Sequence, residues 1–285
     1  MKQFLLTLVC SADGGVPLWL QVASGNRHDS EVFAQVLKDF SEQWTQEGVF
    51  VMDAAFYTQP NLEQVGSLGW LSRVPLTLKA AQALVQSEVS LLSEVPCDQP
   101  DYRMWDVEQT YGEVAQRWVL IESQHRKANT EETFSRQRSR FILATNQLDK
   151  TVWPAQKLLK EYKGQQTVER GFRFLKDPLF FVSSVFVKKP QRVEALALIM
   201  ALTLMVYTLA ERKLRQALED QNQTVPDQRK QPTAKPTFRG MMQKFQGIHW
   251  INLEGQPQIS HLSEERPLII RLLGPPVERY YYASG

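Results

Sequence analysis

Cysteine and histidine are both scarce in this sequence. The 285 residues include two cysteines, Cys10 and Cys97, and four histidines. The two cysteines lie far apart and in no Cys-x-x-Cys spacing, which argues against a disulfide scaffold and against a structural zinc site. The histidines show no metal-ligand spacing either. Because so few thiols fit a reducing compartment, we expect a cytoplasmic protein.

A strong excess of charge of either sign is also missing. The net charge is only +2, so the whole-chain balance does not indicate a polyanion-binding protein. Binding of a polyanion would therefore depend on local basic clusters. Solvated faces and tails are the alternative explanation for about half of these clusters. The clusters are Arg126-Lys127, Arg136/Arg138/Arg140, Arg170/Arg173/Lys176, Lys188-Lys189/Arg192 and Arg229-Lys230/Lys235/Arg239.

Long hydrophobic runs are limited to one segment. Ala195–Ala210 is sixteen residues without a charged side chain, and charged residues flank it on both sides. A membrane-spanning helix needs about 20 apolar residues. We therefore expect a core helix packed under a sheet and no membrane partner. The first residues do not read as a signal peptide, because the apolar stretch Phe4–Cys10 is short and no small-residue cleavage site follows it.

Turn signals and hydrophobic periodicity predict alternating strands and helices in the first third of the chain. Asp13-Gly14 between two β-rich runs is a strong hairpin signal. Val49–Met52 is a short continuous apolar run, which is typical of a strand buried on both faces. The expected order is a hairpin of Lys2–Cys10 and Val16–Ala23, a helix at Glu31–Trp44, the strand Val49–Met52, a helix between Pro60 and Gly69, and a strand at Trp70–Val74.

The remaining elements change from β-rich to helical along the chain. Gln221–Thr237 has almost nothing to bury, so we expect it to be flexible. The apolar tail segments Pro267–Leu273 and Val277–Tyr282 should dock on the body. Before them we expect a helix in Leu76–Ser93, strands at Tyr102–Trp105, Gln109–Val114, Trp118–Ser123 and Phe141–Ala144, an exposed segment at Lys127–Arg140, and helices at Trp153–Tyr162, Gln165–Lys176 and Pro190–Leu218.

Two acids are the candidates for chemistry. Asp53 follows the buried strand and small residues follow it, a position where open α/β sheets place their sites. The alternative is an aspartate that caps the following turn. Glu169 shares a helix face with Gln165, Arg173 and Lys176 at the helical period. Its alternative is a solvated face with a weak Glu169–Arg173 ion pair.

Four segments in order carry a resemblance to a known family. Tyr162, Glu169 and Lys176 resemble the Tyr-x2-Arg-x3-Glu-x6-Lys signature of bacterial insertion-sequence DDE transposases. The segments Gly25–Ser30, Val51–Tyr57 and Ala144–Asn146 are similar to three other segments of that family. Together they span about Gly14 to Leu209, and they are most similar to the subgroup with a β-rich insertion.

The resemblance implies a fold, a site and partners. It implies an α/β protein with a ribonuclease-H-like mixed sheet, helices on both sides, a β-rich insertion and C-terminal helices. We expect core residues 1–75, an insertion at 76–140, core completion at 141–218, and a linker and tail at 219–285. Asp53 and Glu169 would be the second and third catalytic acids and ligands of Mg²⁺ or Mn²⁺ in a two-ion site. Tyr162, Gln165, Arg173 and Lys176 would contact DNA, and a homodimer on DNA at the nucleoid would follow.

Two departures from the family pattern bear on activity. Gln165 stands where the signature has arginine, which weakens a phosphate contact. The first catalytic aspartate would lie on a strand before Met1, so we expect a truncated and inactive copy whose ion site is incomplete. We then expect a slot between the Lys2–Cys10 and Val49–Met52 strands, or direct pairing of the two. Another ribonuclease-H-like nuclease, or a non-catalytic DNA-binding or membrane-associated protein, remains the alternative.

Overall fold

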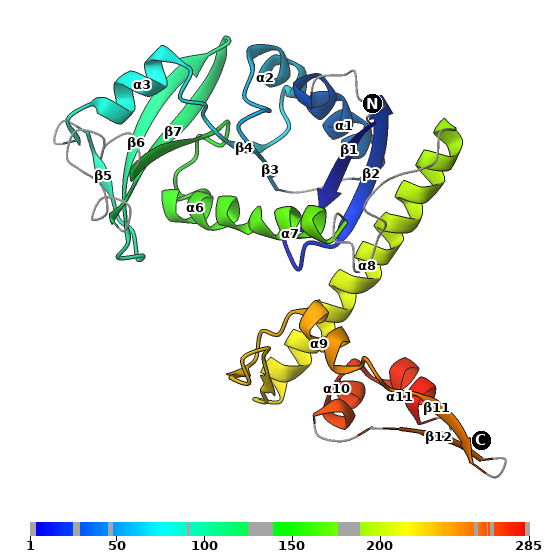
Figure 1. The fold of residues 1–285 in the computed structure, drawn as a ribbon. Helices are drawn as coiled ribbons and strands as arrows, with labels where there is room; N and C mark the ends of the chain where they lie inside the picture. The colour runs from blue at the N-terminus through cyan, green and yellow to red at the C-terminus, as the bar shows by residue number, and fades with distance from the viewer. Residues whose placement is uncertain are drawn as a thin grey trace. The chain divides into compact units, whose positions relative to one another are not determined.

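The chain is seen here in a computed structural model that describes residues 4–24, 29–44, 48–89, 92–124, 139–175, 189–253, 256–260, 262 and 265–282. It divides into two compact units. The first contains residues 1–12 and 19–170, and the second contains residues 13–18 and 171–285. Figure 1 shows the elements of each unit, most of them with labels.

A six-stranded mixed sheet forms the centre of the first unit. Its order is β3-β4-β8-β7-β6-β5. Strands β3 and β4 are parallel, and the other neighbours are antiparallel. The expected mixed sheet is therefore confirmed. The strands are β3 (Phe50–Met52), β4 (Trp70–Arg73), β5 (Glu94–Val95), β6 (Tyr102–Tyr111), β7 (Val114–Ser123) and β8 (Arg140–Thr145).

Helices cover both faces of this sheet. Successive strand side chains point to opposite faces, so each strand supplies two cores. On one face Trp70 and Trp118 pack with helices α1 (Asp29–Gln43), α2 (Gln59–Val65) and α3 (Lys79–Gln86). On the other face Leu71 and Val119 pack with α6 (Ala155–Gly164). The two-sided arrangement expected from the sequence is confirmed.

The β-rich segment differs from the expectation of three short strands. Strands β6 and β7 are ten residues each and pair along their whole length, from Tyr102 opposite Ser123 to Tyr111 opposite Val114. The two loop residues, Gly112 and Glu113, both have φ of 58°. Two positive φ angles match the twist of a hairpin in a type I′ turn. The turn therefore lies inside the strand expected at Gln109–Val114, and the breaks expected at 106–108 and 115–117 lie inside continuous strands.

The predicted N-terminal hairpin is present. Strands β1 (Phe4–Cys10) and β2 (Pro17–Ser24) form a two-stranded sheet of their own. Phe40 of α1 contacts Trp19 of β2 and Phe50 of β3, with ring centroids 6.2 and 5.8 Å apart. Within the described ranges β3 is hydrogen-bonded to β4 alone, so the alternative of direct pairing between β1 and β3 is wrong.

The second unit is organised around the long helix α8 (Pro190–Asp220). Leu214 and Leu218 of α8 are buried against Ile269 and Leu272 of α10 (Arg266–Leu273), and α11 (Pro275–Tyr281) follows. Of the two tail segments predicted to dock, Pro267–Leu273 packs on α8, whereas α11 buries no residue. Along the chain, α9 (Phe238–Lys244) and the antiparallel pair of β11 (Trp250–Leu253) and β12 (Gln256–Ile259) come between α8 and α10.

The segment expected to be flexible has local structure. Residues 221–237 include the antiparallel pair β9 (Val225–Pro226) and β10 (Pro232–Thr233). Asp227 organises the turn, since its Oδ1 accepts the backbone N–H of Arg229 at 2.7 Å and that of Gln231 at 2.8 Å. Average composition does not reveal this local order, because it hides an aspartate that satisfies a turn.

The apolar part of α8 is helical as predicted; Ala197, Ala201 and Leu204 are buried, but most of its large apolar side chains are exposed. Leu198, Ile199 and Val206 are 56%, 58% and 63% exposed. Only 17% of its most apolar window is buried, and by length and composition alone the helix could cross a membrane. The expectation of a buried core helix is therefore wrong for these side chains. A helix that is apolar on all sides gives no period from which its burial can be read.

Candidate functional site

Two parallel strands bring Asp53 and Arg73 to the same edge of the sheet. Met52 of β3 lies opposite Ser72 of β4, and the next residues are Asp53 and Arg73. Ser72 Oγ donates to the carbonyl of Asp53 at 2.8 Å, which fixes the backbone where β3 ends. The Asp53 side chain is exposed, and its Oδ1 accepts the N–H of Ala55 at 2.9 Å. The carboxylate therefore caps the turn, which is the alternative role considered for this aspartate, and among the described residues its other oxygen is available for a further partner.

Thr145 and Asn146 hold β4 in place from the neighbouring strand. Thr145 Oγ1 donates to the carbonyl of Trp70 at 2.6 Å. Asn146 Oδ1 accepts the N–H of Trp70 at 3.0 Å, and its Nδ2 donates to the carbonyl of Leu68 at 2.9 Å. These polar contacts set the start of the strand whose other end carries Arg73.

Glu169 lies on α7 (Gln166–Leu175), which follows α6 after a break. The break is where the sequence predicted it, because α6 ends at Gly164 and Gln165 occupies the turn. The N–H of Gln165 donates to the carbonyl of Tyr162 at 3.1 Å. Glu169 is exposed in the first turn of α7, where a carboxylate interacts favourably with the helix dipole.

The charges of both acids affect the pKa of the Tyr162 hydroxyl. Burial is the main cause that raises the pKa of its hydroxyl above the usual value. The Arg73 guanidinium opposes this by its charge and as a hydrogen-bond donor, whereas the charges of Asp53 and Glu169 raise the pKa further. A tyrosine on α6, an arginine on β4 and the two predicted acids therefore share one electrostatic neighbourhood.

A cavity of about 230 Å³ opens at this place. The aromatic rings of Phe141 and Tyr162 form part of its wall, with centroids 6.3 Å apart. Its polar lining includes Arg73, Lys163, Gln165 and Glu169. The cavity thus joins side chains from β4, α6 and α7 that lie far apart in the sequence.

The other predicted site residues are placed less centrally. Arg173 is exposed on α7, and Lys176 lies outside the described residues. Among the residues that the structure describes, no group of three or more His, Cys, Asp or Glu could hold a metal ion. Carboxylate oxygens are the ligands that Mg²⁺ prefers. Two carboxylates can suffice, because a bound Mg²⁺ ion keeps several of its water ligands.

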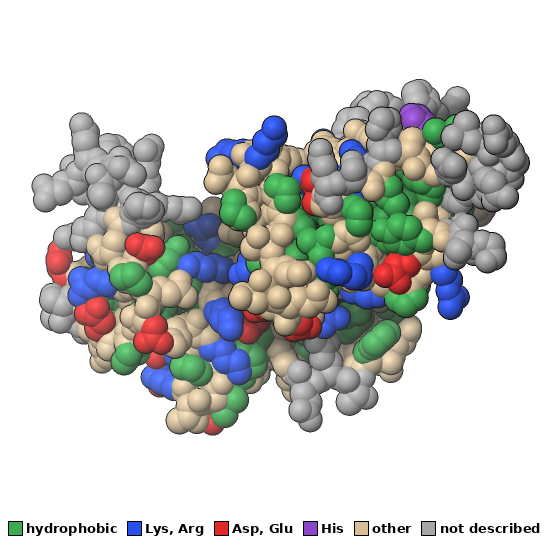
Figure 2. Space-filling model, turned by 90° about the horizontal axis from the view of Figure 1, so that it is seen from below, with side chains coloured by type: hydrophobic (Ala, Val, Ile, Leu, Met, Phe, Trp, Pro, Cys, Tyr) green, Lys and Arg blue, Asp and Glu red, His purple; other side chains and the backbone are tan. Residues whose placement is uncertain are grey.

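One predicted phosphate contact is wrong. Arg140 is 5% exposed, and its Nε donates to Glu122 Oε1 at 2.8 Å. Its Nη1 donates to the carbonyls of Val85 and Ser87, both at 3.0 Å. With these partners the guanidinium is part of the core and cannot reach DNA. On the face in Figure 2, lysine and arginine side chains are interspersed with acidic and apolar ones, in keeping with the small net charge.

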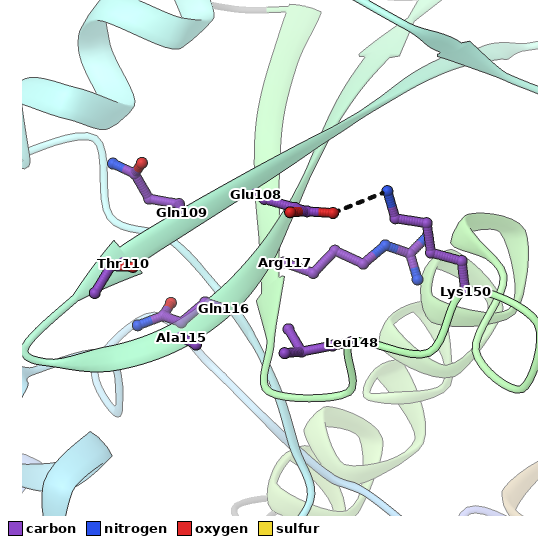
Figure 3. A pocket seen from close by; sticks show the side chains of 8 residues that line it. All are labelled: Glu108, Gln109, Thr110, Ala115, Gln116, Arg117, Leu148 and Lys150. Carbon is purple, nitrogen blue, oxygen red and sulfur yellow. Dashed lines mark ion pairs between the residues drawn. The ribbon is translucent and has the colours of Figure 1, made fainter.

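A second cavity, of about 490 Å³, lies along the β6–β7 hairpin. Figure 3 shows Arg117 in it, with Lys150 and Glu108 forming an ion pair at 3.5 Å. Arg117 is already held by both oxygens of Asp106, at 2.7 and 2.9 Å, and by the carbonyl of Trp153. Because these groups already bind its guanidinium, Arg117 has a structural role, and we assign no ligand to this cavity.

Arg73 is the site residue that the sequence analysis did not single out. Its signal was present in the sequence, since Arg73 follows Trp70–Ser72 much as Asp53 follows Val49–Met52. A charged residue at the end of a second strand is recognisable once the two strands are known to be parallel neighbours.

Comparison with known proteins identifies the family. A family model described as "Transposase DDE domain" matches residues 2–206 of the chain. A comparison with curated proteins gives no match. The matched range includes the mixed sheet, Asp53 and the helix that carries Glu169. The chain belongs to the transposase DDE domain family.

Proposed function

We propose that this chain acts in DNA transposition through a metal-dependent site for strand cleavage and strand transfer, with Asp53 and Glu169 as ligands of Mg²⁺ or Mn²⁺. The observation that carries the proposal is geometric: Asp53 follows the strand end next to Arg73, and Arg73 and Glu169 line one cavity. Membership of the transposase DDE domain family supports it. DNA is the proposed partner, a homodimer on DNA the proposed assembly, and the cytoplasmic nucleoid the proposed location.

We assign metal binding and DNA positioning to different residues. Asp53 and Glu169 supply negative oxygens from a strand end and a helix, and Ser72 holds the backbone of Asp53. A bound divalent ion would activate the attacking water or 3′-hydroxyl and stabilise the leaving oxygen. Tyr162, Gln165, Arg173 and Lys176 are proposed to position the DNA strand.

Activity of the isolated chain is proposed to be very low. Within the described residues the two acids have no third metal-binding partner. With two carboxylates the ions are held weakly, because a two-ion site depends on shared carboxylates. We therefore expect no measurable cleavage of DNA by the 285-residue chain with Mg²⁺ or Mn²⁺.

Mn²⁺ titration of the chain tests this proposal. Asp53→Asn and Glu169→Gln each keep the shape of the side chain and remove its charge. Each should weaken Mn²⁺ binding by more than the roughly 10–100-fold that loss of an outer-shell partner costs. Glu63→Gln, an exposed acid on α2, is the matched control and should bind as the unaltered chain does. Equal affinities in all four proteins would refute the proposal.

A second candidate is favoured by the exposed apolar side chains of α8. A helix of this length and composition is weak support for membrane association. Fractionation of cells that express the chain separates the two functions. Recovery in the membrane fraction, with release by detergent only, would favour the membrane-associated protein over the transposase.

A further inference from the structure

Arg73 is the least committed cation of the cavity beside the two acids. Lys163, the other cation in the lining, donates to Gln99 Oε1 at 2.7 Å and lies 3.9 Å from the ring centroid of Tyr102. Gln165 contributes only a neutral amide. Within the described part of the chain, no carboxylate forms an ion pair with Arg73. Its positive charge is therefore not neutralised by a direct contact.

The Arg73 guanidinium is nevertheless held in a defined place. Its Cζ lies 5.5 Å from the ring centroid of Phe141, within the range of a cation–π contact. Tyr162 lines the same cavity, and the positive charge of Arg73 lowers the pKa of its hydroxyl. Arginine has five N–H donors, and among the described residues these contacts leave several of them available. A guanidinium held against a ring keeps its edges available for paired hydrogen bonds to an oxyanion.

The surroundings make a phosphate the fitting ligand. A phosphodiester carries one negative charge on two free oxygens, which matches the fork of a guanidinium. The position is at the end of β4, directly next to the strand end that carries Asp53. A strand that reached the two acids would bring its own charge into their repulsive field, and a cation at this point would offset it.

We propose that Arg73, held against the ring of Phe141, binds a phosphodiester group of the DNA strand that enters the acidic edge of the sheet. The inference rests on the proposed function, because it takes DNA to be the substrate of the Asp53–Glu169 site. It assigns the phosphate contact to a strand end, in addition to the positions on α6 and α7 predicted from the sequence.

Salt-dependent binding of a fluorescein-labelled DNA duplex by the whole chain, measured in EDTA, tests the proposal. Log K falls as log salt rises, and loss of one phosphate contact makes this negative slope shallower by about 0.9. Arg73→Gln should show this loss together with weaker binding. Arg73→Lys should keep the slope but bind more weakly than the unaltered chain. Lys79→Gln, an exposed charge on α3 outside the cavity lining, should change neither the slope nor the affinity.

Two results would overturn the proposal. One is an Arg73→Gln variant whose slope and affinity equal those of Lys79→Gln, with thermal unfolding showing that both are folded. The other is no binding by the unaltered chain at low salt. Because EDTA removes divalent ions, the assay is independent of the Mn²⁺ titration. If the chain did not bind Mn²⁺ but Arg73→Gln still weakened DNA binding, the proposed function would be refuted and the phosphate contact would be supported.

Discussion

Replacing Arg140 by leucine would break a buried ion pair between β7 and β8. Arg140 and Glu122 lie directly opposite each other in the sheet and are 5% and 1% exposed. The same guanidinium donates to the carbonyls of Val85 and Ser87, so it ties the sheet to the end of α3. Arg140→Leu would leave a carboxylate and two carbonyls in the core without these donors.

The expected loss is large compared with the stability of a domain. Removing one partner of a buried pair costs about 3–5 kcal/mol, whereas the whole free energy of unfolding is typically about 5–15 kcal/mol. The corresponding surface pair gives a control. Arg103 and Glu94 are 2.6 Å apart with side chains 44% and 47% exposed, and such pairs contribute about 1 kcal/mol or less.

Urea unfolding followed by tryptophan fluorescence measures the difference. Arg140→Leu should lower the free energy of unfolding by about 3–5 kcal/mol, and Arg103→Leu by about 1 kcal/mol or less. The double variant Glu122→Leu/Arg140→Leu should recover part of the loss, since no buried charge remains. If Arg140→Leu cost no more than Arg103→Leu, the argument from burial would be refuted.

Two further predictions concern side chains of the first unit, the buried Tyr57 and the half-buried Cys10. Tyr57→Phe should lower the free energy of unfolding by about 0.5–1.5 kcal/mol in the same urea titration. The reason is that the Tyr57 hydroxyl donates to Gln116 Oε1 at 2.5 Å and accepts from Trp118 Nε1 at 3.0 Å; an unchanged midpoint would contradict this. Burial raises the pKa of the Cys10 thiol to about 12, and iodoacetamide reacts with the thiolate. In a Cys97→Ala variant at mildly alkaline pH, Cys10 should therefore be alkylated far more slowly in the folded protein than in urea. Equal rates of alkylation would show that the thiol is not protected.

Sequence patterns predicted the elements whose signals are local. Asp13-Gly14 marked the first hairpin, and the apolar run before Asp53 marked β3. Gly164 marked the break between α6 and α7, which sets where Glu169 stands. In each case a turn residue or a short apolar run carried the information within a few positions.

Features that depend on distant contacts could not be predicted in this way. The pairing of β6 with β7 was missed because polar residues on one side of each strand broke the apolar pattern around Gly112. Arg140 looked like a surface cation, since nothing in its neighbours reveals Glu122 on the adjacent strand. Arg73 became a site residue only when β3 and β4 proved to be parallel and Tyr162 came near from α6.

The central claim, that Asp53 and Glu169 share a divalent cation, has a direct test. Fe²⁺ added in place of Mg²⁺, with ascorbate and peroxide, generates radicals that cut the protein backbone close to the bound ion. Cuts are expected beside both Asp53 and Glu169, and both sets should disappear in Asp53→Asn and also in Glu169→Gln. Cuts near only one of the two acids, or cuts that persist near one acid when the other is changed, would contradict a shared ion.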